Sequence, residues 1–339
     1  MIASPEPLIS TQGLHVGFRV GSGWLARAKR WLGAVQDVSI AIQKGETLGL
    51  VGESGCGKST LGRALLRLVE PAAGRILLEG QDITRLGPSE LRPLRRRMQI
   101  VFQDPYSSLN PRLRVRAALG EAMRVHRLVE GASEEEQRVA ALLERVGLEP
   151  AHMRRYPGEF SGGQRQRIGI ARALAVEPRF VVADEPVSSL DVSVQAQICN
   201  LLKDLQEELG LGYLFVAHDL NVVEFMSHRI AVMYLGRIVE LASAQRLCAE
   251  PRHPYTKALL GSVRLLDRDR GAGHALLKGD VPNPLDPPAG CGFHPRCPVA
   301  QNGLCDVEIP ALRPVEEDRW VSCHLAEEQT PPERQPKYN

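Results

Sequence analysis

Neither an excess of charge nor a long apolar run is present in this sequence of 339 residues. Lys and Arg total 42 against 40 Asp and Glu, and the net charge of +2 gives no global electrostatic reason to bind nucleic acid or an acidic membrane. No stretch approaches the ~18 consecutive apolar residues that a spanning helix needs, and the N-terminus lacks the basic flank and apolar stretch of a secretory signal. We expect a cytosolic chain that remains free to dock on a membrane protein.

Cysteine is sparse along most of the chain and crowded near its end. Four of the seven cysteines fall in the last fifth of the sequence, at Cys291, Cys297, Cys305 and Cys323. A reducing compartment disfavours disulfides, so this cluster suggests metal or iron–sulfur ligation. Its spacing lacks the tight pair usual at zinc sites, whereas Cys297-Pro298 has a form common at iron–sulfur sites. We prefer iron–sulfur ligation, with zinc and free thiols as alternatives, and interpret His294 and His324 as bystanders.

A glycine-rich loop predicts phosphate binding. The segment GESGCGKS lies between the apolar strand ETLGLVG and the helical segment KSTLGRALLRLVE, in which Leu61, Leu65 and Leu68 share one face. Glycines let successive backbone N–H groups curl around phosphate oxygens, and the helix points its positive end at the anion. Lys58 would supply a mobile charge to the β- and γ-phosphates, and Ser59 an oxygen ligand to Mg²⁺. The predicted nucleotide contacts are Gly52, Glu53, Ser54, Gly55, Cys56, Gly57, Lys58, Ser59 and Thr60.

Two further motifs complete the predicted nucleotide site. FVVADE, residues 180–185, predicts a buried strand from which Asp184 emerges to hold Mg²⁺ and Glu185 to polarise the attacking water. A second helical segment begins with Ser161, Gly162, Gly163 and Gln164, where a serine N-cap and two glycines expose N–H groups to an anion. Because one nucleotide already has its phosphate loop, this second anion site indicates the nucleotide of a second subunit. Residues 133–136 form a capping box that predicts another helix start.

These motifs, in this order, resemble those of the ATP-binding cassette (ABC) ATPases over roughly residues 8–245. The signature of that family reads LSGGQ, and this chain has Phe160 in place of the leucine. The resemblance implies that Gln103 touches Mg²⁺ and faces the membrane subunits, and that His218 contacts the γ-phosphate. It also implies that the segment SSLD, which ends at Asp191, crosses a dimer interface.

The same resemblance implies an aromatic residue that stacks on adenine. Phe18 is the candidate, with Trp24 or Trp31 as alternatives. The implied catalysis is electrostatic and positional, since phosphate charge must be neutralised and the attacking water ordered. The implied catalytic residues are Lys58, Glu185 and His218, and the implied Mg²⁺ ligands are Ser59, Gln103 and Asp184.

Within the family, several strings resemble the ATPase subunits of dipeptide and oligopeptide importers. They are GESGCGKSTLGRALLRL, VFQDPYSSLNPR, EFSGGQRQRIGIARAL, DVSVQAQICNLL and EPRHPYTKALL. Cys56, with Leu-Gly-Arg after the Ser-Thr pair, is typical of the F-type member of a D/F pair. The resemblance implies a heterodimer with a D-type ATPase on two transmembrane permease subunits, at the cytoplasmic face of the inner membrane. A periplasmic or extracellular substrate-binding protein would act indirectly, and the cysteine tail resembles that of this subgroup, in which some members carry a [4Fe–4S] cluster.

We therefore expect an α/β P-loop NTPase fold, RecA-like, with an antiparallel β subdomain and a helical signature subdomain at about 106–165. The ATPase domain would span 1–250 and the cysteine-rich C-terminal extension 251–339. The predicted function is ATP hydrolysis that powers peptide import. Alternatives are the same machinery for nickel or glutathione, a soluble ABC ATPase of nucleic-acid metabolism with a zinc module, and a redox sensor that only binds nucleotide. The single cassette disfavours the soluble ATPase, and no nucleic-acid partner is expected; Glu185 and His218 disfavour the sensor.

Overall fold

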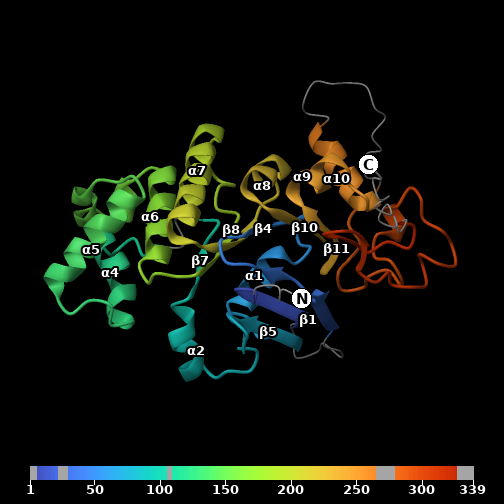
Figure 1. Ribbon diagram of the computed structural model, residues 1–339, viewed down its shortest axis with the longest axis horizontal. Helices are drawn as coiled ribbons and strands as arrows, with labels where there is room; N and C mark the ends of the chain where they lie inside the picture. The colour runs from blue at the N-terminus through green and yellow to red at the C-terminus, as the bar shows by residue number, and fades with distance from the viewer. Residues whose placement is uncertain (1–5, 22–29, 105–108, 265–278, 327–339) are drawn as a thin grey trace, which may run out of the picture.

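The computed structural model describes residues 6–21, 30–104, 109–264 and 279–326 (Figure 1). The strands are β1 (Ile9–Val20), β2 (Arg30–Val38), β3 (Ala41–Ile42), β4 (Thr47–Val51), β5 (Ala73–Leu78), β6 (Gln81–Asp82), β7 (Met98–Val101), β8 (Phe180–Asp184), β9 (Gly212–Val216), β10 (Arg229–Tyr234), β11 (Arg237–Ser243), β12 (Arg313–Glu316) and β13 (Arg319–Val321). The helices are α1 (Lys58–Leu65), α2 (Pro88–Arg95), α4 (Val115–Val125), α5 (Ala132–Arg145), α6 (Gly162–Leu174), α7 (Val192–Leu209), α8 (Leu220–Met226), α9 (Ala244–Ala249) and α10 (Pro254–Arg264). Short 3₁₀ turns are η1 (Pro150–Arg154), η2 (Pro157–Glu159) and η3 (His294–Arg296).

A central eight-stranded sheet runs in the order β12-β13-β11-β10-β4-β9-β8-β7. Its strands β10, β4, β9, β8 and β7 are parallel, so their carboxyl ends meet at one edge. Ligands of open α/β sheets bind at this edge, because the loops that follow the strands converge there. The topology thus brings the loops after β4, β7, β8 and β9 together. Among the described residues, no helix is long and apolar enough to span a membrane.

A second, antiparallel sheet covers α1 on the side of the central sheet opposite to α6, α7 and α8 (Figure 1). Its order is β2-β1-β5-β6, with β3 paired to β1. The expected antiparallel β subdomain is confirmed, since β1 pairs antiparallel with β2, β3 and β5. Leu61 and Leu65 of α1 are fully buried in the core between the two sheets.

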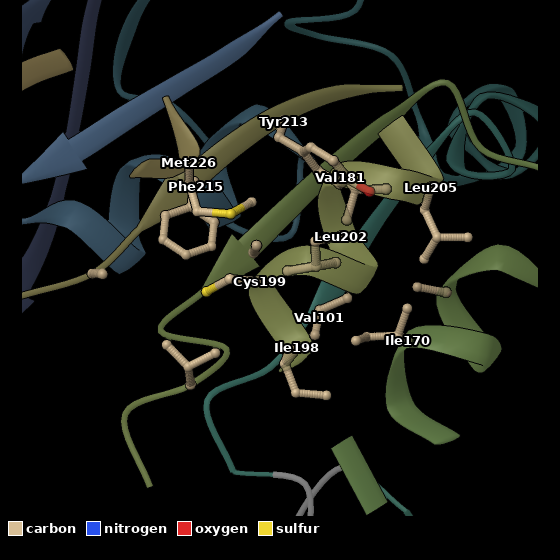
Figure 2. Packing of buried hydrophobic residues seen from close by; sticks show 14 of the residues in the cluster. Val101, Ile170, Val181, Ile198, Cys199, Leu202, Leu205, Tyr213, Phe215 and Met226 are labelled. Carbon is tan, nitrogen blue, oxygen red and sulfur yellow. The ribbon is translucent and has the colours of Figure 1, made fainter. Parts of the chain in front are cut away.

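The main core lies between the central sheet and helices α6, α7 and α8 (Figure 2). Ile198, Leu202 and Leu205 follow helical spacing along α7 and pack onto Tyr213 and Phe215 of β9. Each fully buried side chain of this size contributes about 1.5–3 kcal/mol relative to its exposed state. This packing fixes β8 and β9, which carry polar residues at their carboxyl ends, against α7.

Two local expectations were wrong. Leu68 does not extend the apolar face of α1, because the helix ends at Leu65, Arg67 takes a left-handed φ of 52°, and Leu68 is half exposed. The predicted capping box at 133–136 is also absent from the start of α5: that helix begins at Ala132 with Gly131 as its N-cap. Local sequence could not reveal that the extended backbone of Gly131 starts the helix two residues early.

The C-terminal region adds strands to the central sheet. β13 pairs antiparallel with β11, and β12 with β13, so the central sheet continues beyond β11. Arg319 of β13 is buried and donates to the carbonyl oxygens of Glu250 at 2.6 Å and Arg246 at 3.0 Å. The region that follows α9 is therefore bound to the preceding part of the chain by a strand ladder and by buried hydrogen bonds.

Candidate active site

The glycine-rich loop connects the carboxyl end of β4 to α1. Gly52, Gly55 and Gly57 have φ angles of 152°, 81° and 108°, a region that other residues rarely adopt. A Cβ atom at Gly52 would overlap the carbonyl oxygen of Met233, and one at Gly57 would overlap that of Ala34. Glycine is thus required both by the turn and by the close approach of neighbouring backbone.

Lys58 places its charge inside this loop. Its Nζ donates to the carbonyl oxygens of Gly52 at 2.7 Å and Glu53 at 3.1 Å, and the residue is buried. The Sγ atom of Cys56 lies 3.9 Å from the same Nζ. Burial raises the pKa of the Cys56 thiol, an effect that the Lys58 charge opposes. The arrangement presents a desolvated cation and loop N–H groups, which suits an anionic phosphate chain.

Ser59 and Asp184 form a pair of oxygen groups beside the loop. The Ser59 Oγ, in the first turn of α1, donates to Oδ1 of Asp184 at 2.8 Å, at the end of β8. Hydroxyl and carboxylate oxygens are the ligands that Mg²⁺ prefers. Helix and strand therefore bring together two of the three predicted Mg²⁺ ligands, and their chemistry fits the ion.

Glu185, Gln103 and His218 meet at the carboxyl ends of three neighbouring strands. Gln103 Nε2 donates to Glu185 Oε2 at 2.8 Å, and His218 Nδ1 lies 3.9 Å from the same oxygen. Glu185 adopts a left-handed φ of 49°, a strained conformation for a residue with a side chain. Its side chain is 20% exposed and that of His218 is 65% exposed. A carboxylate oriented by an amide and open to solvent can accept a proton from water.

The predicted signature residues form a helix start of their own. Ser161 caps α6: its Oγ accepts from the Gln164 backbone N–H at 3.3 Å, and its own N–H donates to Gln164 Oε1 at 3.1 Å. Gly163 faces Val194 of α7 so closely that a Cβ would crowd it. Asp191 caps α7 by accepting from the Val194 N–H at 2.9 Å, and hydrogen bonds from Ser193 and Val194 lower the pKa of Asp191. Ser161 and Asp191 are both exposed.

The aromatic candidates for adenine lie on opposite faces of the antiparallel sheet. Gly17 pairs with Gly33, so Trp31 shares the face of Gly17, whereas Phe18 projects from the other. The ring of Trp31 lies over Gly17, and both aromatic side chains are exposed, Phe18 by 41% and Trp31 by 52%. Only one of them can therefore stack on a given base. Trp24 lies outside the described residues.

Comparison with known proteins decides the family. A model of the ABC transporter family matches residues 35–188, and a model of the oligopeptide/dipeptide transporter C-terminal region matches residues 239–305. The probable peptide ABC transporter ATP-binding protein y4tS of Sinorhizobium fredii is 51% identical over 94% of this chain and 90% of its own length. The oligopeptide transport ATP-binding protein AppF of Bacillus subtilis is 49% identical over 95% and 98%. The chain belongs to the ATP-binding subunits of peptide ABC transporters.

The fold of this ABC ATPase matches solved cassettes. A dimeric post-hydrolysis structure of the cassette MJ0796, bound to ADP and phosphate, aligns with a TM-score of 0.62 and 29% identity, covering 70% of this chain and 98% of that one. The cassette cbiO1 from Clostridium perfringens also gives 0.62, with 26% identity, 72% and 92% coverage. The expected P-loop NTPase fold and the expected ATPase activity are confirmed. ATP and Mg²⁺ are the substrate and cofactor of the family.

The four late cysteines of this ABC ATPase come together in the fold. They line one small cavity with His294 and His324, and all four are free thiols. Burial raises the pKa of the Cys291 and Cys323 thiols, and neighbouring cysteines add to the effect. Each histidine contacts a backbone carbonyl through a ring nitrogen, His294 that of Cys291 and His324 that of Glu308. Within the described ranges, no three His, Cys, Asp or Glu side chains are arranged to hold a metal ion, so iron–sulfur binding stays a prediction.

Sequence reasoning missed two residues that contact the glycine-rich loop of this ATPase. The Tyr255 hydroxyl accepts from the Glu53 backbone N–H, and the Arg296 guanidinium pairs with the Glu53 carboxylate. Tyr255 belongs to the string EPRHPYTKALL, and Arg296 precedes Cys297, so both lie in segments noticed for other reasons. No spacing rule links position 53 to positions 255 and 296, and only the fold brings them together.

Proposed function

We propose that this ABC ATPase is the F-type subunit of an importer for di- and oligopeptides, bound at the cytoplasmic face of the cell membrane. The observation that carries this proposal is the match of residues 239–305 to the oligopeptide/dipeptide transporter C-terminal region. The relatives y4tS and AppF are named for peptide and oligopeptide transport. We divide the chain into a cassette, 1–250, with its helical subdomain at about 106–165, and an extension, 251–339.

The proposed chemistry assigns a role to each residue at the sheet edge. The loop 52–60 binds the phosphates, with Lys58 neutralising their charge. Ser59, Asp184 and Gln103 would hold Mg²⁺, which would supply further charge neutralisation. Glu185 accepts the proton of the attacking water, and Gln103 orients its carboxylate. His218, whose Nδ1 lies 3.9 Å from Glu185 Oε2, contacts the γ-phosphate. Phe18 stacks on adenine.

A second subunit completes the site in this proposal. Ser161, Gly162, Gly163 and Gln164 form an exposed helix start, which suits the nucleotide of a partner. Asp191, on the adjacent helix start, would face the same interface. The proposed partner is a related D-type ATPase, and two permease subunits would join the pair; a substrate-binding protein would deliver the peptide outside.

Reconstitution tests the cargo and the partners. The chain would be co-expressed with a related D-type ATPase and two permease subunits, and the complex placed in proteoliposomes. We expect ATP hydrolysis to rise when a peptide-loaded binding protein is added. The same binding protein without peptide is the control. Stimulation by nickel or glutathione instead would replace the cargo, and purification as a homodimer would overturn the heterodimer.

We also propose that Cys291, Cys297, Cys305 and Cys323 ligate a [4Fe–4S] cluster. The support is their shared cavity and their chemistry, since soft thiolates are the usual ligands of iron–sulfur clusters. A cluster of this kind is larger than a single ion, so its four ligands need not converge on one point. Its proposed role is to staple an extension that has little core of its own.

Metal analysis of anaerobically purified protein tests the cluster. We expect about four iron atoms per chain and a broad absorption band near ~400 nm, as four thiolates suit a cubane cluster. Changing Cys297 to Ser should bleach the protein, because a hard oxygen ligand holds such clusters poorly. Cys199 is the matched control, since it is buried in α7 and lies far in sequence from the four late cysteines. Stoichiometric zinc without iron would refute the cluster.

A further inference from the structure

The C-terminal region touches the phosphate loop at one residue, Glu53. Arg296 donates two hydrogen bonds to its carboxylate, from Nη1 to Oε2 at 2.7 Å and from Nη2 to Oε1 at 3.0 Å. The Tyr255 hydroxyl accepts from the Glu53 backbone N–H at 2.8 Å. Two segments, 202 and 243 residues away in sequence, thus fix the backbone and the side chain of the same loop residue.

Arg296 is built into its position. It ends η3, its side chain is only 6% exposed, and its Nη1 also lies 3.4 Å from the Tyr234 hydroxyl. A guanidinium that forms a bidentate pair of hydrogen bonds with a carboxylate is geometrically selective, and a lysine ammonium cannot reproduce both bonds. The hydrogen bonds to Glu53 raise the pKa of Arg296, so its charge persists at any working pH.

Tyr255 is held equally firmly. Its ring is fully buried, with centroids 4.6 Å from Tyr234 and 5.4 Å from Phe293. Its backbone N–H donates to Nδ1 of His253 at 3.0 Å, where α10 begins. Burial raises the pKa of Tyr255, which keeps its hydroxyl protonated. The hydroxyl therefore reaches the loop from a rigid support.

Glu53 is an anionic side chain inside a loop that binds an anion. Its carbonyl oxygen accepts one of the two hydrogen bonds from Lys58, at 3.1 Å. An unpaired carboxylate here would repel phosphate and compete for the Lys58 charge. Arg296 neutralises this carboxylate and ties it to the extension. Tyr255 fixes the orientation of the peptide group between Gly52 and Glu53.

Attachment of the extension does not depend on these contacts. β13 already pairs with β11, and Arg319 already bonds to the carbonyl oxygens of Glu250 and Arg246. His253 and Arg252 add backbone hydrogen bonds to the buried carboxylate of Glu240. The contacts at Glu53 are therefore additional, and they concentrate on the loop that carries Lys58.

We propose that Arg296 and Tyr255 are positioning residues for ATP binding: they hold Glu53 so that the phosphate loop presents Lys58 and its free N–H groups to the triphosphate. The inference rests on the proposed role of residues 52–60 as the phosphate loop. It makes the C-terminal region a part of the nucleotide site. Its effect falls on ATP affinity, because neither residue contacts Glu185, Gln103 or His218 among the described interactions.

Binding of a fluorescent ATP analogue to the full chain tests this proposal. We expect Arg296→Gln to raise the Kd about tenfold, equivalent to ~1.4 kcal/mol, because it leaves the Glu53 charge unpaired. In the assembled transporter, KM should rise far more than kcat falls. Arg296→Lys keeps the charge but loses the second hydrogen bond. Its Kd should therefore lie between those of the wild type and Arg296→Gln. Arg252→Gln is the matched control, since Arg252 pairs with Glu316 at 2.6 Å, away from the loop.

A double variant tests whether Arg296 acts through the Glu53 carboxylate. Glu53→Gln in the Arg296→Gln background should bring the Kd back to within about threefold of the wild type, because the unpaired charge is gone. If Arg296 acted independently of Glu53, the two losses would add, because only sites that do not interact have additive effects. Tyr255→Phe keeps the ring and removes the acceptor oxygen, and we expect a Kd about threefold higher with an unchanged melting temperature.

The outcomes are distinct. Wild-type Kd values for both Arg296→Gln and Tyr255→Phe would overturn the proposal, and so would additive losses in the double variant. If Arg296→Gln failed to fold, Arg296→Lys and Tyr255→Phe would decide by the same measurement. ATP binding retained by Lys58→Ala would instead refute the phosphate-loop assignment itself, which keeps the two failures apart.

Discussion

Replacing Glu185 with Gln removes a proton acceptor while nearly preserving shape. In the structure the Glu185 carboxylate accepts from Gln103 Nε2 at 2.8 Å and lies 3.9 Å from His218 Nδ1. The new amide oxygen can still accept from Gln103, and the φ of 49° is equally demanding for either side chain. We therefore expect the free energy of unfolding to change by less than ~1 kcal/mol.

The expected effect on catalysis is much larger. A positioned general base contributes about 10²–10⁴ in rate, so kcat should fall by that factor, which corresponds to ~3–5 kcal/mol in the barrier. ATP binding should be retained, because Lys58, Ser59 and Asp184 keep their contacts. ATP should then accumulate unhydrolysed in a closed dimer with the partner subunit.

The assay is phosphate release by the assembled transporter, with ATP binding measured in parallel. Glu177→Gln is a matched control, because Glu177 also has a left-handed φ, 54°, but pairs with Arg96 on the surface, away from the sheet edge. Its kcat should equal that of the wild type. A Glu185→Gln variant that hydrolyses ATP within threefold of the wild-type rate would refute the role assigned to Glu185.

Further predictions concern the nucleotide contacts. Lys58→Ala should abolish ATP binding, measured by a fluorescent analogue, because it removes the buried cation of the proposed phosphate loop. Ser161→Arg should spare ATP binding to the isolated chain yet stop turnover in the assembled complex; loss of binding by the monomer would show that Ser161 serves its own fold. Phe18→Ala should weaken binding of an adenine nucleotide, and Trp31→Ala should not, since the two rings lie on opposite faces; the reverse result would reassign the stacking residue. Iodoacetamide should alkylate Cys56 slowly at pH 8 and faster as pH rises, because burial raises its pKa and the thiolate is the nucleophile; mass spectrometry with and without bound ATP would check this.

Much of the site could be predicted because its signals are local. Glycines mark the loop before Lys58, and the apolar run FVVADE marks a buried strand that ends in Asp184. Parallel strands then bring their carboxyl ends together, so short motifs far apart in sequence become neighbours. The Ser161 N-cap was likewise predictable, since a cap depends on a few adjacent residues.

The rest depends on contacts that sequence does not encode locally. The pairing of β13 with β11 joins segments that share no periodicity, and the Arg296–Glu53 pair forms only after both are placed by the fold. The end of α1 was predicted too late in the sequence, because the left-handed conformation there is adopted by Arg67 and not by a glycine, which would have marked it. The cysteine spacing indicated a cluster, but the cavity that gathers the four thiols is a product of tertiary packing.

The late arrival of β13 in the central sheet matters for how the chain is made. About 75 residues separate β11 from β13, so at usual synthesis rates β11 waits about 4–15 s with one edge unpaired. An unpaired strand edge is a template for aggregation, and the newborn cassette passes through this exposed state each time it is synthesised. Deleting the whole segment that carries the four late cysteines, which includes residues 313–321, would make that exposure permanent. Point substitutions are therefore the safer way to remove the thiols, because they leave the last strand to close the sheet.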